Sequence, residues 1–101
     1  MFRREELRRK YLDAVLDLGQ LLFAQRDYAR AAESYRRAIE KEAVLETAHR
    51  ELMRCLARLG ERGQALRHFQ TLTQIMHDEL GAPPAPESVA LYERLKQGEE
   101  I

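Results

Sequence analysis

The chain has 101 residues, of which 45% are hydrophobic and 34% charged, and its 17 basic and 17 acidic residues leave no formal net charge. This length suits one domain, and the balanced charge excludes the general basic excess that nucleic-acid-binding proteins carry. The single cysteine excludes an internal disulfide. Neither a membrane span of about 18 apolar residues nor a signal peptide is visible, so we expect a cytoplasmic protein without membrane contact.

Apolar residues at steps of three and four predict a succession of helices along the chain. The predicted helices span residues 3–25, 28–42, 46–59, 62–80 and 87–97. The first helix carries Val15, Leu18 and Leu22 on one face, which we expect to be buried. At the breaks between helices, Asp27 is suited to an N-cap and Gly60 to the left-handed position that follows a helix.

The last predicted helix follows a segment that cannot be helical. Residues 81–86 contain one glycine and three prolines, a composition that ends a helix and favours an extended link. Pro86 itself is suited to the first turn of the next helix. That helix presents Val89, Tyr92 and Leu95 on one face, which predicts contact with the rest of the molecule.

The four preceding helices form two pairs that repeat at a spacing of 34 residues, the period of tetratricopeptide proteins. Adding 34 to Ala31 and Tyr35 gives Ala65 and Phe69, a small residue followed by an aromatic one in both copies. The other matched positions are Val15, Leu18, Gly19, Leu22 and Ala38 in the first pair and His49, Leu52, Met53, Leu56 and Leu72 in the second. Small residues let helices approach, so Met53 in place of a glycine predicts wider packing in the second pair.

We therefore predict an all-α fold, a tetratricopeptide-like stack of two helical hairpins plus a C-terminal capping helix, in one domain over residues 1–101. Repeat 1 covers about residues 12–45, repeat 2 about 46–79 and the capping helix about 87–97. Such repeats bury their faces by stacking, so the last helix is expected to cover one end. The first helix extends beyond its repeat, and we expect this overhang to meet a further domain or a partner.

The region from Ala48 to Leu66, together with Phe69, the Glu79-Leu80-Gly81 segment with its proline link, and Leu91-Tyr92, resembles the second repeat of the bacterial transcriptional activator domain. The resemblance covers nearly the whole chain. It implies a regulatory module of transcription activators of the antibiotic-regulatory-protein type, where it follows a winged-helix DNA-binding domain and serves dimerisation or contact with other proteins. The chain has no room for a winged helix, so we expect a piece of a longer regulator or a free-standing relative that does not itself bind promoters.

A basic stripe is the candidate binding surface. Arg50, Arg54 and Arg58 are four residues apart and share one helical face. The repeat places Arg50 and Arg54 on the inner side of the stack, where their counterparts in the first pair are Leu16 and Gln20. Arginines bind carboxylates bidentately, so these five residues form a candidate groove for an acidic peptide or a partner's C-terminus. The alternative interpretation is that the arginines are solvated or pair with neighbouring glutamates.

The residues do not suggest catalysis, a cofactor or a metal. Cys55 lacks a suitable base, because His49 is six residues earlier and matches its helical face poorly, so we predict a small buried residue. The three histidines lack metal-ligand spacing, and neither a phosphate-binding glycine loop nor a nucleophile elbow is present. We expect no enzyme and no cofactor or metal site.

Three functions remain open from the sequence. The first is a non-catalytic protein–protein interaction or dimerisation module of a bacterial transcription regulator, acting as a homodimer or on another component of transcription control. The second is a nucleic-acid-binding accessory domain that uses the basic residues of the first helix, which are Arg3, Arg4, Arg8, Arg9 and Lys10. Glu5 and Glu6 lie four residues before Arg9 and Lys10, which favours a helix-stabilising role for that cluster. The third is a purely structural spacer between domains of a longer regulator.

Overall fold

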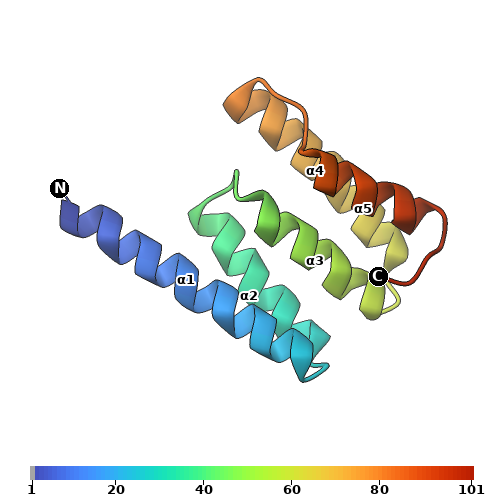
Figure 1. Ribbon diagram of the computed structural model, residues 1–101, viewed down its shortest axis with the longest axis horizontal. Coiled ribbons are helices and arrows are strands. Elements are labelled where there is room, and N and C mark those ends of the chain that lie inside the picture. Colours follow the sequence, from blue (N-terminus) through green and yellow to red (C-terminus); the bar gives the residue numbers. More distant parts are fainter. Residues whose placement is uncertain (1) are drawn as a thin grey trace.

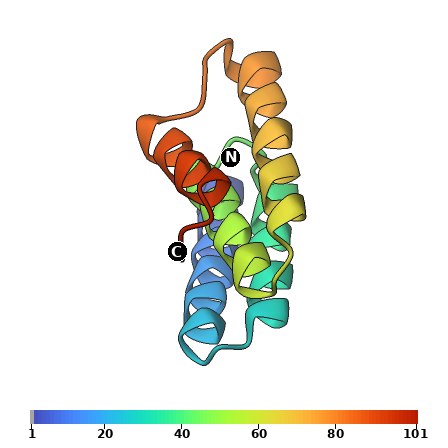
Figure 2. The same cartoon turned by 90° about the vertical axis from the view of Figure 1, so that its right-hand side faces the viewer.

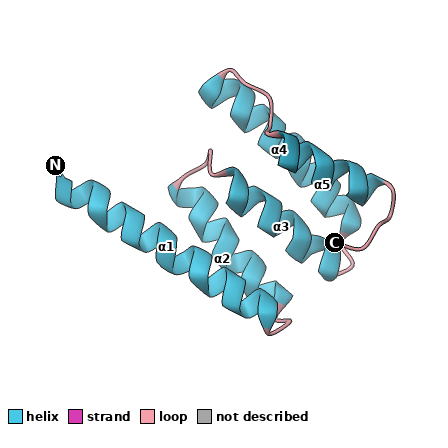
Figure 3. Ribbon diagram, viewed as in Figure 1, coloured by secondary structure: helices cyan, strands magenta, loops and turns pink. Residues whose placement is uncertain are grey.

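A computed structural model describes residues 2–101 and shows a stack of helices joined by short turns and one proline-rich link (Figure 1). The helices are α1 (Phe2–Ala24), α2 (Tyr28–Lys41), α3 (Glu46–Arg58), α4 (Arg62–Leu80) and α5 (Pro86–Lys96). The described residues contain helix and loop and no strand (Figure 3). The predicted all-α fold is confirmed, and every helix boundary lies within one residue of its predicted position.

The helices pack in chain order: α1 on α2, α2 on α3, and α3 on α4. Neighbours run antiparallel, and α5 lies against both α3 and α4 (Figure 1). Figure 2 shows α2 and α4 along one side of the stack and α1 and α5 along the other. The Cα positions extend over 46 × 35 × 17 Å, a slab about two helices thick. None of these helices, within residues 2–101, combines the length and the apolar character that crossing a bilayer demands.

The breaks between helices have the local chemistry that the sequence predicts. The Asp27 side chain accepts a hydrogen bond from the Arg30 backbone N–H at 3.3 Å and so caps the N-terminus of α2. Gly60 and Gly81 adopt φ values of 79° and 60°, the left-handed conformation that ends a helix at little cost when the residue has no Cβ. Pro86 is the first residue of α5.

In the first helix pair, α1 and α2, a glycine of α1 packs directly against an aromatic ring of α2. A Cβ added to Gly19 would lie 2.7 Å from Cζ of Tyr35, so only glycine permits this approach. Ala31 and Ala65 are both 0% exposed, as nested repeat positions require. In the second pair, α3 and α4, Met53 occupies the glycine position and is itself 0% exposed.

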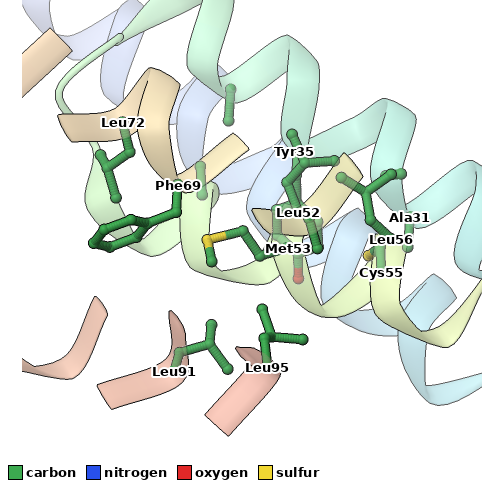
Figure 4. Close-up of a cluster of buried hydrophobic side chains, with 14 of the residues drawn as sticks. Ala31, Tyr35, Leu52, Met53, Cys55, Leu56, Phe69, Leu72, Leu91 and Leu95 are labelled. Carbon is green, nitrogen blue, oxygen red and sulfur yellow. The ribbon is translucent and has the colours of Figure 1, made fainter. Parts of the chain in front are cut away.

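In the second pair, the aromatic residue of the repeat packs against α5. The Phe69 ring stacks on Tyr92 with centroids 4.1 Å apart, and Leu91 and Leu95 are buried beside Met53 (Figure 4). The predicted capping of the second pair by the last helix is therefore confirmed. The prediction that Val89 belongs to the buried face is wrong, because that side chain is 39% exposed. The buried residues of α5 are Ser88, Leu91 and Leu95, so the predicted contact of Leu95 is confirmed.

Both ends of α5 are held by charged side chains of the second pair. The Glu46 carboxylate accepts hydrogen bonds from the Ala85 backbone N–H at 2.9 Å and from Ser88 Oγ at 2.6 Å. At the other end, Arg62 Nη1 donates to the Leu95 carbonyl at 2.7 Å. An anion at the N-terminus and a cation at the C-terminus complement the helix dipole. These contacts therefore hold α5 in place in addition to the packing of its apolar face.

Candidate functional site

The first arginine of the predicted groove serves the fold. Arg50 Nη1 donates to Ser88 Oγ at 3.0 Å and lies 3.9 Å from Glu46 Oε2, and its side chain is 20% exposed. Its second terminal nitrogen donates to Thr47 Oγ1 at 3.4 Å. Arg50 thus completes the network that holds the N-terminus of α5, so its charge is already matched by Glu46.

The last arginine of the stripe is also engaged. Arg58 Nε donates to the Ile101 carbonyl at 2.6 Å, and Nη1 donates to the Tyr28 hydroxyl at 2.9 Å. Its guanidinium lies 5.3 Å from the centroid of the Phe23 ring and 5.5 Å from that of Tyr28, within cation–π distance. Arg58 therefore joins the turn between α1 and α2 to α3 and to the last residue of the chain.

The remaining groove residues make fewer contacts with distant parts of the chain. Arg54 has a long ion pair of 3.5 Å with Glu51 on the same helix, Leu16 packs partly against the core, and Gln20 is exposed. The structure thus places two of the three predicted arginines in contacts within the fold and leaves Arg54 and Gln20 on the surface. Whether these residues bind an acidic peptide stays a prediction.

A pair of histidines lies between α3 and α4. His49 Nδ1 and His68 Nε2 are 2.9 Å apart, and His49 Nε2 lies 2.7 Å from the Ala43 carbonyl. Since a carbonyl only accepts, His49 donates from Nε2. When both rings are neutral, His49 Nδ1 accepts a hydrogen bond from His68 Nε2. Burial lowers the pKa of His49, and burial together with the His49 and Arg36 charges lowers the pKa of His68 to about 4.

The first helix pair has a hydrogen bond at the same repeat positions. Ser34 Oγ donates to the Val15 carbonyl at 2.5 Å, and adding 34 to these numbers gives His68 and His49. Sequence reasoning considered the histidines only as metal ligands and missed their contact. The sequence shows only that His49 and His68 lie 34 residues after Val15 and Ser34, and the burial of Ser34 became visible in the structure. A pair lacks the third ligand of a metal site, and no group of three potential ligands occurs in the described part of the chain.

The lone cysteine is packed inside the stack. Cys55 is 0% exposed, and burial, followed by the Glu51 charge, raises the pKa of its thiol to about 12. A thiol that stays protonated at neutral pH is a poor nucleophile. The prediction of a small buried residue is therefore confirmed.

The basic end of α1 is partly neutralised by α2. Arg8 Nη2 lies 2.9 Å from Glu42 Oε2 and donates to the Lys41 carbonyl at 3.0 Å, while Lys41 Nζ lies 5.4 Å from the Tyr11 ring centroid. These contacts anchor the first turns of α1 to the end of α2. Among the described residues, the expected ion pairs of Glu5 with Arg9 and of Glu6 with Lys10 do not form. The ion pair that α1 makes is the one between Arg8 and Glu42, which joins two helices.

One side of α1 carries apolar side chains that stay largely exposed, although Leu7 and Tyr11 at its first turns line a hollow with Glu40 and Lys41 of α2. This open face consists of Leu7, Tyr11, Ala14, Leu18 and Leu21. The exposed fractions of the leucines are 58%, 39% and 55% in chain order, and that of the tyrosine is 41%. The prediction that Leu18 lies in the core is wrong. Figure 1 shows the reason: α1 lies at the edge of the stack, with α2 on one side only.

The second repeat shows how these positions are used when a neighbour is present. Adding 34 to Ala14, Leu18 and Leu21 gives Ala48, Leu52 and Cys55, which are 0%, 2% and 0% exposed. Those residues belong to α3, which packs on α2. The open face of α1 is therefore the surface on which a preceding helix would pack.

Comparison with known proteins identifies the family. The family model of the bacterial transcriptional activator domain matches residues 2–96. No curated protein and no solved structure matches the chain. Because the family match includes all five helices, the chain belongs to the bacterial transcriptional activator domain family, a family of transcription-regulator domains rather than of enzymes.

Proposed function

We propose that this domain is a non-catalytic protein-interaction module of a bacterial transcription regulator, and that its contact surface is the open face of α1. One observation carries the proposal: Leu18 and Leu21 are exposed, while Leu52 and Cys55, at the same repeat positions, are buried under a helix. Contiguous exposed apolar residues on a protein surface are typical of interaction sites. Family membership supports a role in transcription regulation, which takes place in the cytoplasm of bacteria.

The chemistry of the open face favours a protein helix as its ligand. Its residues are aliphatic or aromatic, and the partly exposed leucines follow the spacing that buries side chains between two helices. Burying one leucine side chain completely contributes about 1.5–3 kcal/mol, so covering Leu7, Leu18 and Leu21 supplies a substantial part of the free energy of a helix–helix contact.

The groove on the inner side of the stack is the weaker candidate surface. Arg50 and Arg58 would have to leave their partners in the fold before binding an external carboxylate, and leaving Glu46 unpaired costs free energy. The other groove residues contribute less, because Arg54 pairs with Glu51 and Leu16 packs partly against the core. We therefore place the main contact on α1.

The other two candidate functions have less support. For nucleic acid, Arg8 is already paired with Glu42, and Glu40 lines the same hollow as Arg3 and Arg4, so phosphate would meet an acidic neighbour. For a purely structural spacer, an exposed apolar face has no use. Neither function accounts for the open leucines.

Two neighbouring residues on α1 allow a matched experiment. Leu21→Glu places a charge in the open face, whereas Gln20→Glu adds a charge one residue earlier, on another side of the helix. In cells whose chromosomal copy carries either change, RNA sequencing should show at least a tenfold loss of regulated transcripts for Leu21→Glu and none for Gln20→Glu, at equal protein levels. Normal transcript levels with Leu21→Glu would exclude the open face as the contact surface.

A further inference from the structure

We propose that a pocket between α2 and α4 binds a small aliphatic hydroxy acid, a molecule with a hydrocarbon chain, one carboxylate and a hydroxyl group. This α2–α4 pocket has a volume of about 590 Å³, with walls from α2 and α4 and a floor from α3. Figure 2 shows both wall helices along the same side of the stack. Volumes of a few hundred Å³ are typical of small-molecule sites. The proposal concerns a different surface from the open face of α1 and does not rest on the proposed function.

The floor of the α2–α4 pocket is aliphatic. Leu52 and Leu56 of α3 are only 2% and 3% exposed, and Ile39 of α2 lies half-buried at the edge of the pocket. Figure 4 shows the two leucines on α3 as part of the core cluster. Among the described residues, no phenylalanine, tyrosine or tryptophan lines the pocket, so its apolar surface suits a hydrocarbon chain better than a large aromatic ring system. Burial of such a chain on this floor is favourable.

Two arginines, one from each wall, give the pocket a site for an anion. Arg36 of α2 has a long ion pair of 3.8 Å with Glu33 of its own helix, and its side chain is 46% exposed. Arg67 of α4 joins no ion pair among residues 2–101. An exposed pair as long as that of Arg36 contributes little to stability, so a ligand can replace Glu33 at small cost. Guanidinium groups bind carboxylates bidentately, so the two arginines favour a carboxylate as the anion.

Two hydrogen-bond acceptors of the pocket receive no hydrogen bond from the described residues. The first is the carboxylate of Glu40 on α2. The second is His68 Nδ1, because a neutral His68 donates from Nε2 to His49. Burial, followed by the charges of His49 and Arg36, lowers the pKa of His68 to about 4, so the ring is neutral at neutral pH. A ligand hydroxyl can donate to either acceptor, whereas a second carboxylate would be repelled by Glu40.

The repeat does not require the polar side chains of the α4 wall. Subtracting 34 from Arg67 and Thr71, which both line the pocket, gives Glu33 and Arg37 in the first helix pair. The charge at the position of Arg67 is therefore opposite in the two pairs. Neither Arg67 nor Thr71 forms a side-chain hydrogen bond within the part of the chain that the structure describes. These side chains are thus available to a ligand without loss of a contact in the fold.

Methyl-resolved NMR of the chain, with 3-hydroxyoctanoate as the probe, tests the site. We expect the methyl signals of Ile39, Leu52 and Leu56 to shift and to saturate with a dissociation constant below about 1 mM. The methyl signals of Leu7 and Leu21 report on the open face of α1 and should not move. Absence of saturable shifts at Leu52 and Leu56, or equal shifts at the open face, would overturn the inference.

Two related probes test the ligand class. Octanoate lacks the hydroxyl, so the acceptors Glu40 and His68 gain no donor, and we expect binding weaker by about two- to tenfold. Octane-1,3-diol lacks the charge and should bind at least about tenfold more weakly, because the arginines gain no carboxylate. An affinity equal to that of 3-hydroxyoctanoate for either probe would overturn the assignment of the ligand class.

Neighbouring arginines of α2 provide a matched control. Arg36 and Arg37 are both exposed, and of the two it is Arg36 that lines the pocket. Arg36→Gln and Arg67→Gln should each raise the dissociation constant of 3-hydroxyoctanoate about tenfold, whereas Arg37→Gln should change it less than about twofold. Because all three side chains are exposed, the circular dichroism spectra of the variants should match that of the natural chain. Unchanged binding by Arg36→Gln, or an equal loss with Arg37→Gln, would contradict the pocket as the binding site.

Discussion

The two helix pairs share one repeat but differ in what surrounds them. The second pair lies between α2 and α5, and its repeat positions are sealed, with Met53, Leu72 and Cys55 all 0% exposed. The first pair has a neighbour on one side only, and Leu18 and Leu21 remain on the surface. The comparison teaches that an identical position in a helical repeat is core or binding surface according to whether a neighbouring helix is present.

The largest effect should come from removing a buried side chain from the core of the second helix pair. Met53→Ala removes a fully buried side chain beneath α5, and we expect it to lower the free energy of unfolding by about 2–5 kcal/mol in chemical denaturation. Gly19→Ala makes the opposite change in the first pair, because its new Cβ would press on the Tyr35 ring, and should cost about 1–3 kcal/mol. A loss below 1 kcal/mol for Met53→Ala would show that the second pair is packed less tightly than the structure indicates.

The next largest effect is a pH dependence of stability that only the second helix pair should show. The folded state lowers the pKa of His68 from 6.5 to about 4, so between these values the unfolded chain binds the extra proton. The contribution of His68 to the free energy of unfolding should be fully present above pH 6.5. As the pH is lowered towards 4, the free energy of unfolding should fall on the order of 3 kcal/mol. The first pair has Ser34 at the equivalent position and contributes no such dependence.

The variant His68→Gln isolates this contribution, since its amide can still donate to His49 and does not titrate. Denaturation measured from pH 4 to 7 should show a smaller slope for the variant than for the natural chain. Equal slopes would mean that the histidine pair does not cause the loss of stability in acid.

A smaller effect distinguishes the two inner arginines. Arg50→Glu places a carboxylate beside Glu46 and Ser88 at the N-terminus of α5, so we expect it to destabilise the fold by about 1–3 kcal/mol. Arg54→Glu changes only a long surface pair with Glu51 and should cost less than about 1 kcal/mol. Thermal denaturation followed by circular dichroism gives both values. Equal losses for the two variants would contradict the anchoring role of Arg50.

The candidate site was harder to predict than the fold. The stripe of three arginines was visible in the sequence, because a spacing of four residues places them on one face. Their partners were not visible, since Ser88 and Ile101 lie 38 and 43 residues away from the arginines that contact them. Leu18 was assigned to the core for a related reason: helical spacing separates apolar from polar faces, and it does not show whether an apolar face has a neighbour.

Local chemistry in the sequence was sufficient for the helices, their ends and the repeat. Periodicity, the Asp27 cap, the glycine ends and Pro86 act within one or two turns of the chain, and the nested Ala31 and Ala65 follow from the shared repeat. The tertiary structure alone decided which faces are sealed, how His49 and His68 meet, and which charges hold α5. Those contacts join residues 19 or more positions apart, and their free energy arises only when the helices are packed together.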